Sequence, residues 1–325
     1  MTVHDTQIAA VCDAMRAEKL VAIAIHENPD SDAVGAAVGM LDLFEQLGVP
    51  GRIHISPAQP LPIAEAFLGA DYVSHELPPH DATLYAIDCG SFARLALAVD
   101  SWDGVIVNID HHHDNSSYGS LNLVCPEASS ASEIVCDLAT ALPLAIRPWA
   151  ANALYAGISF DTGHFRHQNT SSHALSCAAV LVEAGADPRR IYQLLYETRT
   201  LPTLRLWARA LSSVIAVAGG SGLIAVLAAA DYRETGADHN ETEGMVDFLR
   251  SIHGVRVAAL VKQHGNGDTS RASLRSHGVD VSAVAALKGG GGHREAAGFT
   301  TVGAPEEVAG WLSTELEKLL STGSS

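Results

Sequence analysis

The sequence predicts an α/β protein whose first domain is built on a parallel β-sheet, and three observations support this. Short, almost purely apolar segments occur at 20–25, 84–87 and 105–109, and such runs are typical of parallel strands that are buried on both faces. A segment with helical periodicity follows the first of them at 33–47, as expected where strands and helices alternate. The chain has 325 residues, which is more than one hydrophobic core usually organises, so we expect a second domain.

The first domain is expected to continue this alternation. Gly48 and Pro50 end the helix over 33–47, because neither residue favours its continuation. Asp187 precedes Pro188, and this pair is typical of an N-cap followed by proline at the first helical position. The remaining expected elements are a strand at 52–55, a proline-rich loop at 57–62, and helices at 130–142, 148–158, 171–184 and 188–198.

The second domain is expected to be smaller and also of the α/β class. We place the first domain at 1–190, a connecting helical linker at 191–211, with its helix near 202–211, and the second domain at 212–325. The strands of the second domain are predicted at 213–218, 222–228, 255–262 and 269–276, and its helices at 241–251, 280–287, with Asp280 as the cap, and 305–320.

Composition limits the classes of partner and the compartment. The chain carries 37 acidic and 20 basic residues, a formal net charge of −17, so it lacks the positive surface needed for long duplex nucleic acid. A short phosphorylated ligand remains compatible if bound metals and a few arginines supply local positive charge. The five cysteines form no C-x-x-C pair, which argues against a disulfide framework or a zinc knuckle and for a reducing cytoplasm. We expect no signal peptide and no membrane-spanning segment.

Acidic and imidazole side chains follow the predicted strands at the points where these strands end. The carboxyl ends of parallel strands lie at one edge of the sheet, where ligands of α/β proteins gather. The apolar segment 155–158 before Asp161 is interpreted as a further strand end, although it also lies in the helix predicted at 148–158. The residues expected at this edge are His26, Asp30, Asp32, Asp88, Asp110, His111, His112 and Asp161.

This set of residue types predicts a metal centre. Oxygen and imidazole ligands without thiolate suit Mn²⁺ or Mg²⁺ and, less specifically, zinc or iron. Four ionised aspartates balance the charge of two divalent ions, which leads to the hypothesis of a two-metal hydrolytic site. The alternative for any single aspartate is a turn or helix cap, but the combination favours metal binding. Cys89 directly follows Asp88; we expect a buried, inert thiol there rather than a reactive one.

The order and spacing of these residues resemble the motifs of the DHH phosphoesterase superfamily. The matching segments are His26-x-x-Pro29-Asp30-x-Asp32-Ala33-x-Gly35, then Asp88, Asp110-His111-His112 and Asp161-Thr162-Gly163. Farther along, the segment 289–298, GGGGHREAAG, resembles the glycine-rich signature of the DHHA1 domain, and 273–276 resembles the strand that precedes it. The two-domain layout is similar to the branch that contains nanoRNases, phosphoadenosine-phosphate phosphatases and cyclic-dinucleotide phosphodiesterases.

The resemblance implies an active site in the cleft between the two domains, with two divalent metal ions. These would most readily be Mn²⁺, with Mg²⁺ or Co²⁺ as alternatives. A hydroxide activated by both metals would attack phosphorus, His112 would protonate the leaving oxygen, and Asp110 would orient a histidine. The family assigns one metal to His26, Asp30 and Asp88 and the other to Asp32, Asp88, His111 and Asp161, with Asp88 as the bridge.

The resemblance also implies a substrate grip on the second domain. The glycine run is interpreted as a loop at the start of a helix, where backbone amides can hold an anion. Arg166 either reaches the same ligand or is a surface arginine. The implied phosphate-binding residues are Ser273, Arg275, Gly291, Gly292 and His293.

The implied substrates are short RNA oligonucleotides, phosphoadenosine phosphate, and linear or cyclic dinucleotides, and the family also implies a homodimer. Two alternatives remain open from the sequence. The first is an inorganic pyrophosphatase or polyphosphatase, which shares the metal-binding motifs. The second is a nucleotide-sensing module that retains the fold without catalysis.

Overall fold

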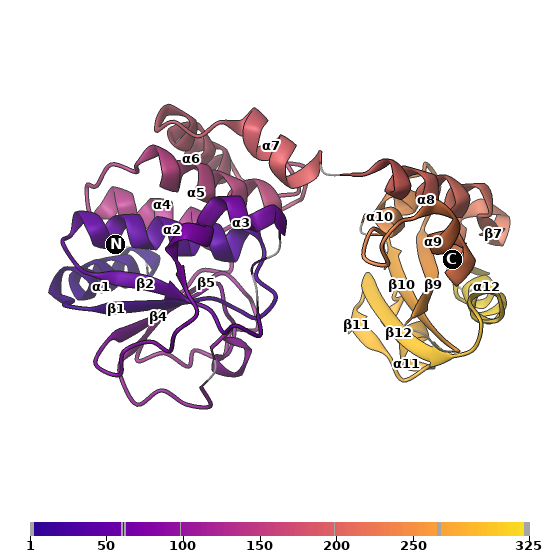
Figure 1. The fold of residues 1–325 in the computed structure, drawn as a ribbon, viewed down its shortest axis with the longest axis horizontal. Coiled ribbons are helices and arrows are strands. Elements are labelled where there is room, and N and C mark those ends of the chain that lie inside the picture. The colour runs from indigo at the N-terminus through magenta and orange to yellow at the C-terminus, as the bar shows by residue number, and fades with distance from the viewer. Residues whose placement is uncertain are drawn as a thin grey trace. The chain divides into compact units, whose positions relative to one another are not determined.

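The chain forms two compact units, residues 1–198 and 199–325, shown in the computed structural model of Figure 1. The boundary falls inside the segment 191–211 that the sequence suggests as a linker. The structure describes residues 3–59, 61, 63–97, 99–197, 199–242, 244–264 and 268–321. Within these ranges, no helix is both long and apolar enough to cross a membrane.

The first unit contains a six-stranded parallel sheet in the order β3-β2-β1-β4-β5-β6. The strands predicted near 20–25, 52–55, 84–88 and 105–110 are all confirmed, with ends shifted by at most one residue. Strand β1 lies between β2 and β4, so the strand order reverses direction at β1. In α/β proteins, ligands bind at such a switch point. The strands are β1 (Val21–Ala24), β2 (Gly51–His54), β3 (Val73–Ser74), β4 (Thr83–Ile87), β5 (Ile106–Asp110) and β6 (Leu121–Val124).

The two faces of this sheet are covered in different ways. Helices α2 (Ser31–Gln46), α4 (Ala131–Ala141) and α5 (Pro148–Asp161) lie over one face (Figure 1), where large strand residues such as Ile23 and Tyr85 are buried. On the other face the strands present small residues such as Ala22, Ala24 and Ala86, which pack with side chains of the connecting loops. Residues alternate along each strand between the two faces, so the large side chains pack under the helices and the small ones pack under the thinner layer of loops.

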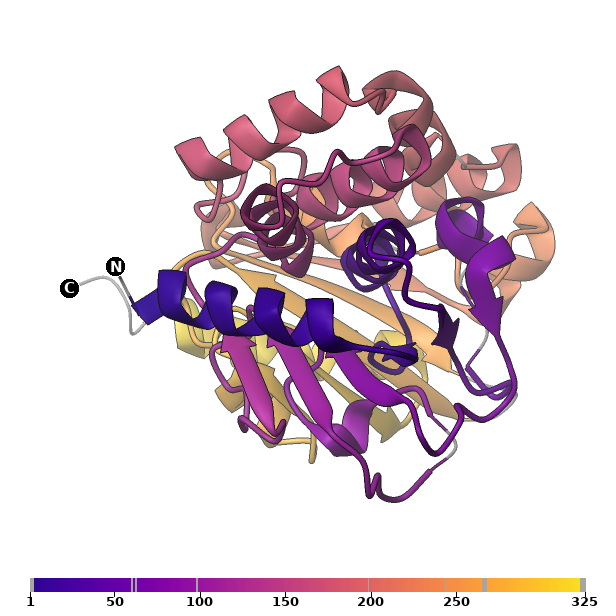
Figure 2. The same ribbon diagram turned by 90° about the vertical axis from the view of Figure 1, so that its left-hand side faces the viewer.

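Close helix packing positions the end of α5. A Cβ atom at Gly35 would collide with the carbonyl oxygen of Ala153, and one at Gly157 would collide with the side chains of Ser132 and Asp32. Glycine at both positions thus lets α2, α4 and α5 approach closely. Helix α1 (Val3–Ala17), the indigo helix in front of the sheet in Figure 2, packs against α4 and β6. This unit also contains the helices α3 (Ile63–Gly69), α6 (Ser172–Glu183) and α7 (Pro188–Tyr196). Asp187 caps α7 as predicted.

The second unit contains a mixed six-stranded sheet in the order β11-β12-β10-β9-β8-β7, in which only β8 and β9 are parallel. The strand predicted at 269–276 is confirmed at both ends. Its strands are β7 (Ile215–Val217), β8 (Gly222–Leu227), β9 (Val257–His264), β10 (Thr269–Ser276), β11 (Gly291–His293) and β12 (Ala296–Val302).

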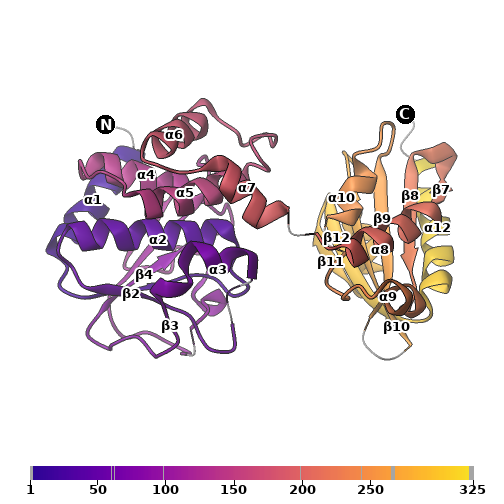
Figure 3. The ribbon, with the colours of Figure 1, turned by 45° about the horizontal axis from the view of Figure 1, so that its top comes forward.

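Helices cover both faces of this second sheet (Figure 3). Helix α8 (Leu201–Ser212) packs into this core through Leu206 and Trp207, so it belongs to the second unit. Helices α9 (Ala229–Thr235) and α10 (Met245–Arg250) lie on the same face as α8, and α11 (Ser282–Ala286) and α12 (Pro305–Ser321) lie on the other.

Candidate active site

The predicted acidic and histidine residues gather at the carboxyl edge of the first sheet, around β1, β4 and β5. Asp88 directly follows β4, and Asp110 is the last residue of β5. Asp30 caps the helix that follows β1, and Asp32 lies in the first turn of that helix. The arrangement expected from the strand ends is therefore present for these four carboxylates.

Asp161 reaches the same cluster by a different route from the one predicted. It is the last residue of helix α5, so the interpretation of 155–158 as a strand end is wrong and the alternative helix at 148–158 is correct. The helix that brings Asp161 to this edge packs on α2 through Gly35 and Gly157. The apolar segment 155–158 is buried because helices surround it, and periodicity alone does not separate that case from a buried strand.

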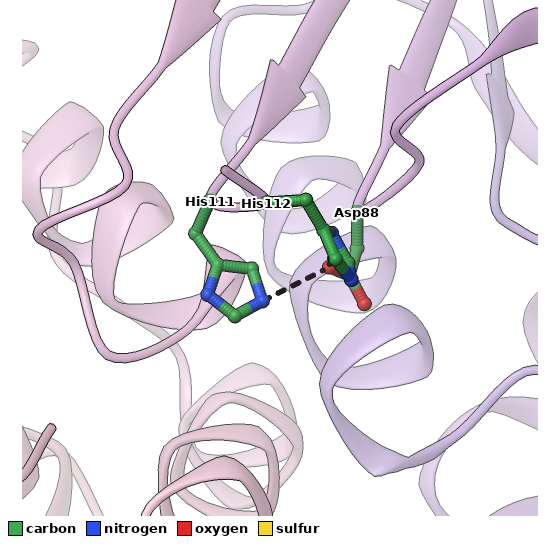
Figure 4. Close-up of side chains that lie close together, drawn as sticks. All are labelled: Asp88, His111 and His112. Atoms are coloured by element: carbon green, nitrogen blue, oxygen red, sulfur yellow. Dashed lines mark ion pairs between the residues drawn. The ribbon is translucent and has the colours of Figure 1, made fainter. Parts of the chain in front are cut away.

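Two groups of potential ligands meet at Asp88. The Nε2 atom of His26 lies 3.5 Å from Asp88 Oδ2 and 3.8 Å from Asp30 Oδ2. The Nε2 atom of His111 lies 3.4 Å from Asp88 Oδ1, and this ion pair is drawn in Figure 4. The same Nε2 atom lies 3.2 Å from Asp161 Oδ2 and 4.0 Å from Asp32 Oδ2. In each of the groups His26–Asp30–Asp88 and Asp32–His111–Asp161, one ligand atom per residue lies within 4.8 Å of the others.

Backbone amides hold the carboxylates of α2 in place. Asp30 Oδ1 accepts hydrogen bonds from the amides of Asp32 and Ala33, which is the helix cap considered above, while its Oδ2 faces His26. The fully buried Asp32 accepts hydrogen bonds from the amides of Ala131 and Ser132 at the N-terminus of α4, where the helix dipole favours negative charge. Asp30 thus caps α2 with one carboxylate oxygen and faces His26 of the ligand cluster with the other.

Asp110 orients His112 instead of facing the other carboxylates. Its Oδ1 atom lies 2.7 Å from His112 Nδ1 and also accepts the His111 amide. Burial favours the neutral form of Asp110, but the hydrogen bonds from His112 and Asn115 lower its pKa. With Nδ1 bound to Asp110, His112 presents Nε2 away from this contact, and its side chain is 35% exposed. The adjacent His113 is exposed as well.

A buried amide network beneath the cluster was not predicted. The Nδ2 group of Asn115 donates to Asp110 and to Asn108 Oδ1, and Asn108 in turn donates to the carbonyl of Cys89. Tyr118 donates to the same carbonyl. These bonds tie the segment after β4 to the segment after β5. Asn108 lies within β5 and Asn115 in the loop after it, so only the proximity of 108 and 115 to the DHH motif could have indicated them.

Cys89 is buried, and its thiol donates to the carbonyl of Ser91. Burial raises the pKa of this thiol, which makes the reactive thiolate scarce. The interpretation of Cys89 as a buried, inert thiol therefore agrees with its environment.

The electrostatics of the cluster are those of a cation site. Burial disfavours the charged form of His26, but hydrogen bonds to Asp30 and Asp88 outweigh it and raise its pKa to about 11. In the same way Asp161 and Asp88 raise the pKa of His111 to about 12. Burial and the neighbouring Asp88 and Asp161 raise the pKa of Asp32. Without a bound cation, protonated His26 and His111 would supply positive charge beside the carboxylates.

The residues present also fit bound divalent cations. Asp88 Oδ1 is buried and forms ion pairs with His111 and His112 at 3.4 and 3.6 Å, but it accepts no hydrogen bond from any residue that the structure describes, although a buried carboxylate oxygen normally accepts one. Asp88 is itself in the left-handed region, with φ at 54°, a conformation that aspartate and asparagine tolerate better than most residues. Carboxylate oxygens and imidazole nitrogens without thiolate are the donors that Mn²⁺ and Mg²⁺ prefer.

In the second unit, four of the five predicted substrate residues lie on one face of the sheet: Ser273, Arg275, Gly291 and His293. Arg275 and His293 both pair with Ala296, and Ser273 and Gly291 both pair with Gly298. Paired residues on neighbouring strands point to the same face. We call the surface formed by Ser273, Arg275, Gly291, His293, Ala296 and Gly298 the shelf, because small residues separate its polar side chains.

The glycine run does not start a helix, contrary to the interpretation above. It enters β11, which pairs with β12 in a hairpin at the edge of the sheet. A Cβ atom at Gly290 would collide with the Gly298 carbonyl oxygen, and Gly292 has φ at 138° and would collide with the Ala296 carbonyl oxygen. The small residues therefore serve close strand packing. Gly292 also points to the face opposite the shelf, since it pairs with Ala297.

Arg166 lies in the loop after α5, in the first unit. Its guanidinium Nε donates to the carbonyl of Gly163, 2.7 Å away, and its side chain is exposed. Arg166 follows Asp161 by five residues, and within the described part of the chain no hydrogen bond or ion pair joins its side chain to another predicted site residue.

Comparisons with known proteins agree with the motifs and the geometry. Residues 20–158 match the N-terminal domain of the DHH family, and residues 219–321 match the DHHA1 domain. A bifunctional oligoribonuclease and PAP phosphatase (NrnA) from Thermus thermophilus is 31% identical over 298 residues, which cover 90% of this chain and 88% of the relative. The chain belongs to the DHH family.

Other similar proteins define the range of named activities. The NrnA of Bacillus subtilis is 27% identical over 84% of this chain and 86% of the relative. A cyclic-di-AMP phosphodiesterase (GdpP) from Geobacillus thermodenitrificans is 28% identical over 82% of this chain but only 42% of that longer relative. An exopolyphosphatase-related protein from Bacteroides fragilis has the same fold, with a TM-score of 0.80, 20% identity and 98% coverage of both chains. This DHH protein is thus a hydrolase that acts on phosphoester bonds.

Proposed function

We propose that this DHH protein is a manganese-dependent phosphoesterase that hydrolyses short RNA oligonucleotides, phosphoadenosine phosphate, or linear and cyclic dinucleotides. The observation that carries the proposal is the position of Asp88, which belongs to one ligand group and lies 3.4 Å from His111 of the other, with His112 held beside it. The names of the relatives from Thermus thermophilus and Bacillus subtilis, and of the cyclic-di-AMP phosphodiesterase, support this range of substrates.

Two divalent cations would be held by the residues of the two groups. His26, Asp30 and Asp88 would hold one, and Asp32, Asp88, His111 and Asp161 the other. When bound, such cations polarise phosphoryl oxygens and lower the pKa of water. The protein contributes rigid ligand positions, because the amides of α4 fix Asp32 and the cap geometry fixes Asp30. Outer contacts of this kind are known to tune metal affinity.

His112 is the residue best suited to transfer a proton to the leaving oxygen. Its Nδ1 is 2.7 Å from buried Asp110, which keeps the imidazole oriented and, with burial opposing, raises the pKa of His112 above its ordinary value. A protonated, partly exposed imidazole beside the ligand cluster meets the requirements of a general acid. Asp110 acts through His112 and is therefore a positioning residue.

The shelf of the second unit is the proposed grip for a phosphate or a terminal nucleotide. Arg275 is half-buried, and its Nε atom lies 3.7 Å from Asp247 of α10, which restrains the guanidinium group. Arginine can form two parallel hydrogen bonds to a phosphate. At Gly291, no heavy atom lies within 4 Å of where a Cβ would be, so the backbone there is open to a ligand.

Hydrolysis by the purified chain tests the proposal directly. The substrates are phosphoadenosine phosphate, a two-nucleotide RNA, cyclic di-AMP and inorganic pyrophosphate, each with Mn²⁺, with Mg²⁺ and with a chelator. We expect cleavage of at least one of the first three with Mn²⁺, and its loss with the chelator. Turnover of pyrophosphate alone would replace the proposal with the pyrophosphatase alternative, and binding without turnover of any nucleotide would favour a sensor.

A further inference from the structure

A second group of potential metal ligands lies on helices α4 and α6, outside the candidate active site. His173 and Cys177 are four residues apart on α6, and Glu133 and Asp137 are four residues apart on α4. This spacing places each pair on one face of its helix. One ligand atom from each of Asp137, His173 and Cys177 lies within 4.8 Å of the others.

The contacts converge on a single atom, His173 Nε2. This nitrogen lies 2.7 Å from Asp137 Oδ1, 3.7 Å from Cys177 Sγ and 4.0 Å from Glu133 Oε1. Zinc–sulfur and zinc–nitrogen bonds of about 2.3 and 2.1 Å at a tetrahedral angle separate sulfur from nitrogen by roughly 3.6 Å. The observed distance between Cys177 and His173 matches this value. The corresponding separation of oxygen from nitrogen is about 3.4 Å, so Asp137 Oδ1 needs to move away from His173 by about 0.7 Å.

The same geometry argues against a nucleophilic cysteine. A thiol activated by a histidine uses one ring nitrogen as the base, while a carboxylate orients the ring through the other nitrogen. Here the thiol and the carboxylate both face Nε2 of His173. A single N–H can satisfy only one of them well, whereas one cation can satisfy all three donors.

Glu133 supplies the fourth donor, and a pocket supplies the entry path. The Glu133 side chain is only 5% exposed, and its Oε2 accepts hydrogen bonds from the amide and hydroxyl of Ser129, which leaves Oε1 directed at His173. A pocket of about 1110 Å³ is lined by Glu133, Asp137 and His173, together with residues of α1 that include Cys12. A metal site needs such an opening as well as oriented ligands.

We propose that Cys177, His173, Asp137 and Glu133 bind a transition-metal ion of the Zn²⁺ class, separately from the cations of the active site. The thiolate distinguishes the two sites, because sulfur with nitrogen and oxygen ligands selects zinc-like ions over Mg²⁺ or Mn²⁺. The absence of a C-x-x-C pair excluded a zinc knuckle, and this site is of another kind, with two ligands from each of two packed helices. The proposal does not depend on the nucleotide substrate.

Cobalt titration of the reduced, full-length protein tests the proposal. Co²⁺ replaces Zn²⁺ at such sites, and a thiolate ligand gives a sulfur-to-cobalt charge-transfer absorption in the near ultraviolet that oxygen and nitrogen ligands do not give. We expect this absorption in the wild-type protein and its removal when Zn²⁺ is added. It should be lost in Cys177→Ser and retained in Cys12→Ser, the matched control at a buried cysteine that lines the pocket.

His173→Gln provides a second variant on an exposed side chain, where the fold is not at risk. It should weaken cobalt binding at this site by roughly tenfold or more, since changes around metal ligands cost at least that much. Circular dichroism and hydrolytic activity of the variants report whether the fold is intact. The proposal is overturned if wild-type protein binds cobalt without the absorption, or if the absorption survives in a folded Cys177→Ser protein.

Discussion

The cluster of the first unit and the shelf of the second differ in how their side chains are held. Around Asp88, nearly every polar atom contacts another residue, so ligand positions are set by the fold alone. On the shelf, Gly291 and His293 are exposed, and small residues leave the surface open. The first arrangement suits chemistry that requires fixed geometry, and the second suits a ligand that supplies its own contacts. Variants of the cluster should therefore mainly lower turnover, and variants of the shelf should mainly raise KM.

The largest expected effect is that of Asp88→Asn. Asparagine tolerates the positive φ of position 88, so this variant removes the charge without the added backbone strain of alanine. The variant changes the carboxylate that belongs to one ligand group and pairs with His111 of the other, and we expect turnover to fall by much more than the 10- to 100-fold cost of an outer-shell change. Asp114→Asn, which changes an exposed aspartate in the loop after β5, is the control. Normal manganese-dependent activity in Asp88→Asn would exclude a bridging role.

The next largest effect is expected for His112→Asn. Removal of a general acid typically lowers turnover by about 10²- to 10⁴-fold, while manganese affinity should change little because neither ligand group requires His112. His113→Asn is the matched control at the neighbouring exposed residue. Measurement of kcat and of manganese affinity by calorimetry separates the two roles. If metal affinity collapses in His112→Asn while kcat at saturating metal is preserved, His112 is a ligand instead.

Metal binding should depend on pH with a sign set by His26 and His111. In the metal-free protein their pKa values are raised to about 11 and 12, so both are protonated at neutral pH, and a ligand imidazole must be neutral. Each must release a proton when a cation binds, so the apparent affinity should increase as pH rises, by about tenfold per pH unit for each proton released. Calorimetry in buffers of different ionisation enthalpy counts these protons. Proton uptake, or no exchange, would contradict the assignment of these ligands.

The sequence predicted the cluster well because strand ends are local features. Asp30, Asp88 and Asp110 follow apolar runs, and parallel strands bring such ends to one edge without further information. Asp161 belongs to the same cluster through the packing of α5 on α2, which depends on contacts between distant segments. The wrong strand assignment before Asp161 therefore did not change the residue predicted, only the reason for it.

Other features were beyond what the sequence pattern could indicate. The hairpin of β11 and β12 was missed because a run of glycines has neither strand nor helix periodicity. His173 and Asp137 are 36 residues apart, and the spacing on each helix gave no sign that the helices pack side by side. Likewise, the hydrogen bond from Asn115 to the carbonyl of Cys89 joins two loops whose proximity follows from the order of β4 and β5 in the sheet.

On the shelf, Arg275→Ala should mainly raise KM. A charge-assisted hydrogen bond contributes roughly 1.5–3 kcal/mol, which corresponds to an increase in KM of about 10- to 100-fold with kcat nearly unchanged. Arg271→Ala is the matched control, since Arg271 lies on the same strand but pairs with Thr300, outside the shelf. An equal rise in KM in Arg275→Ala and Arg271→Ala would indicate that both arginines only attract an anionic substrate through their charge. An unchanged KM in Arg275→Ala would remove this residue from the substrate site.

The smallest expected effect, and the one that isolates the shelf most cleanly, is that of Gly291→Ala. The backbone at Gly291 is outside the left-handed region, and an added Cβ meets no heavy atom within 4 Å, so the variant should be as stable as the wild-type protein. A methyl group on the shelf should nevertheless obstruct a ligand that approaches the backbone, and we expect KM to rise roughly threefold to tenfold at unchanged kcat. Thermal unfolding is the control measurement. Because the protein itself gives no packing reason for glycine at this position, an unchanged KM would mean that the substrate does not approach Gly291, whereas a selective rise would assign the open backbone to the ligand.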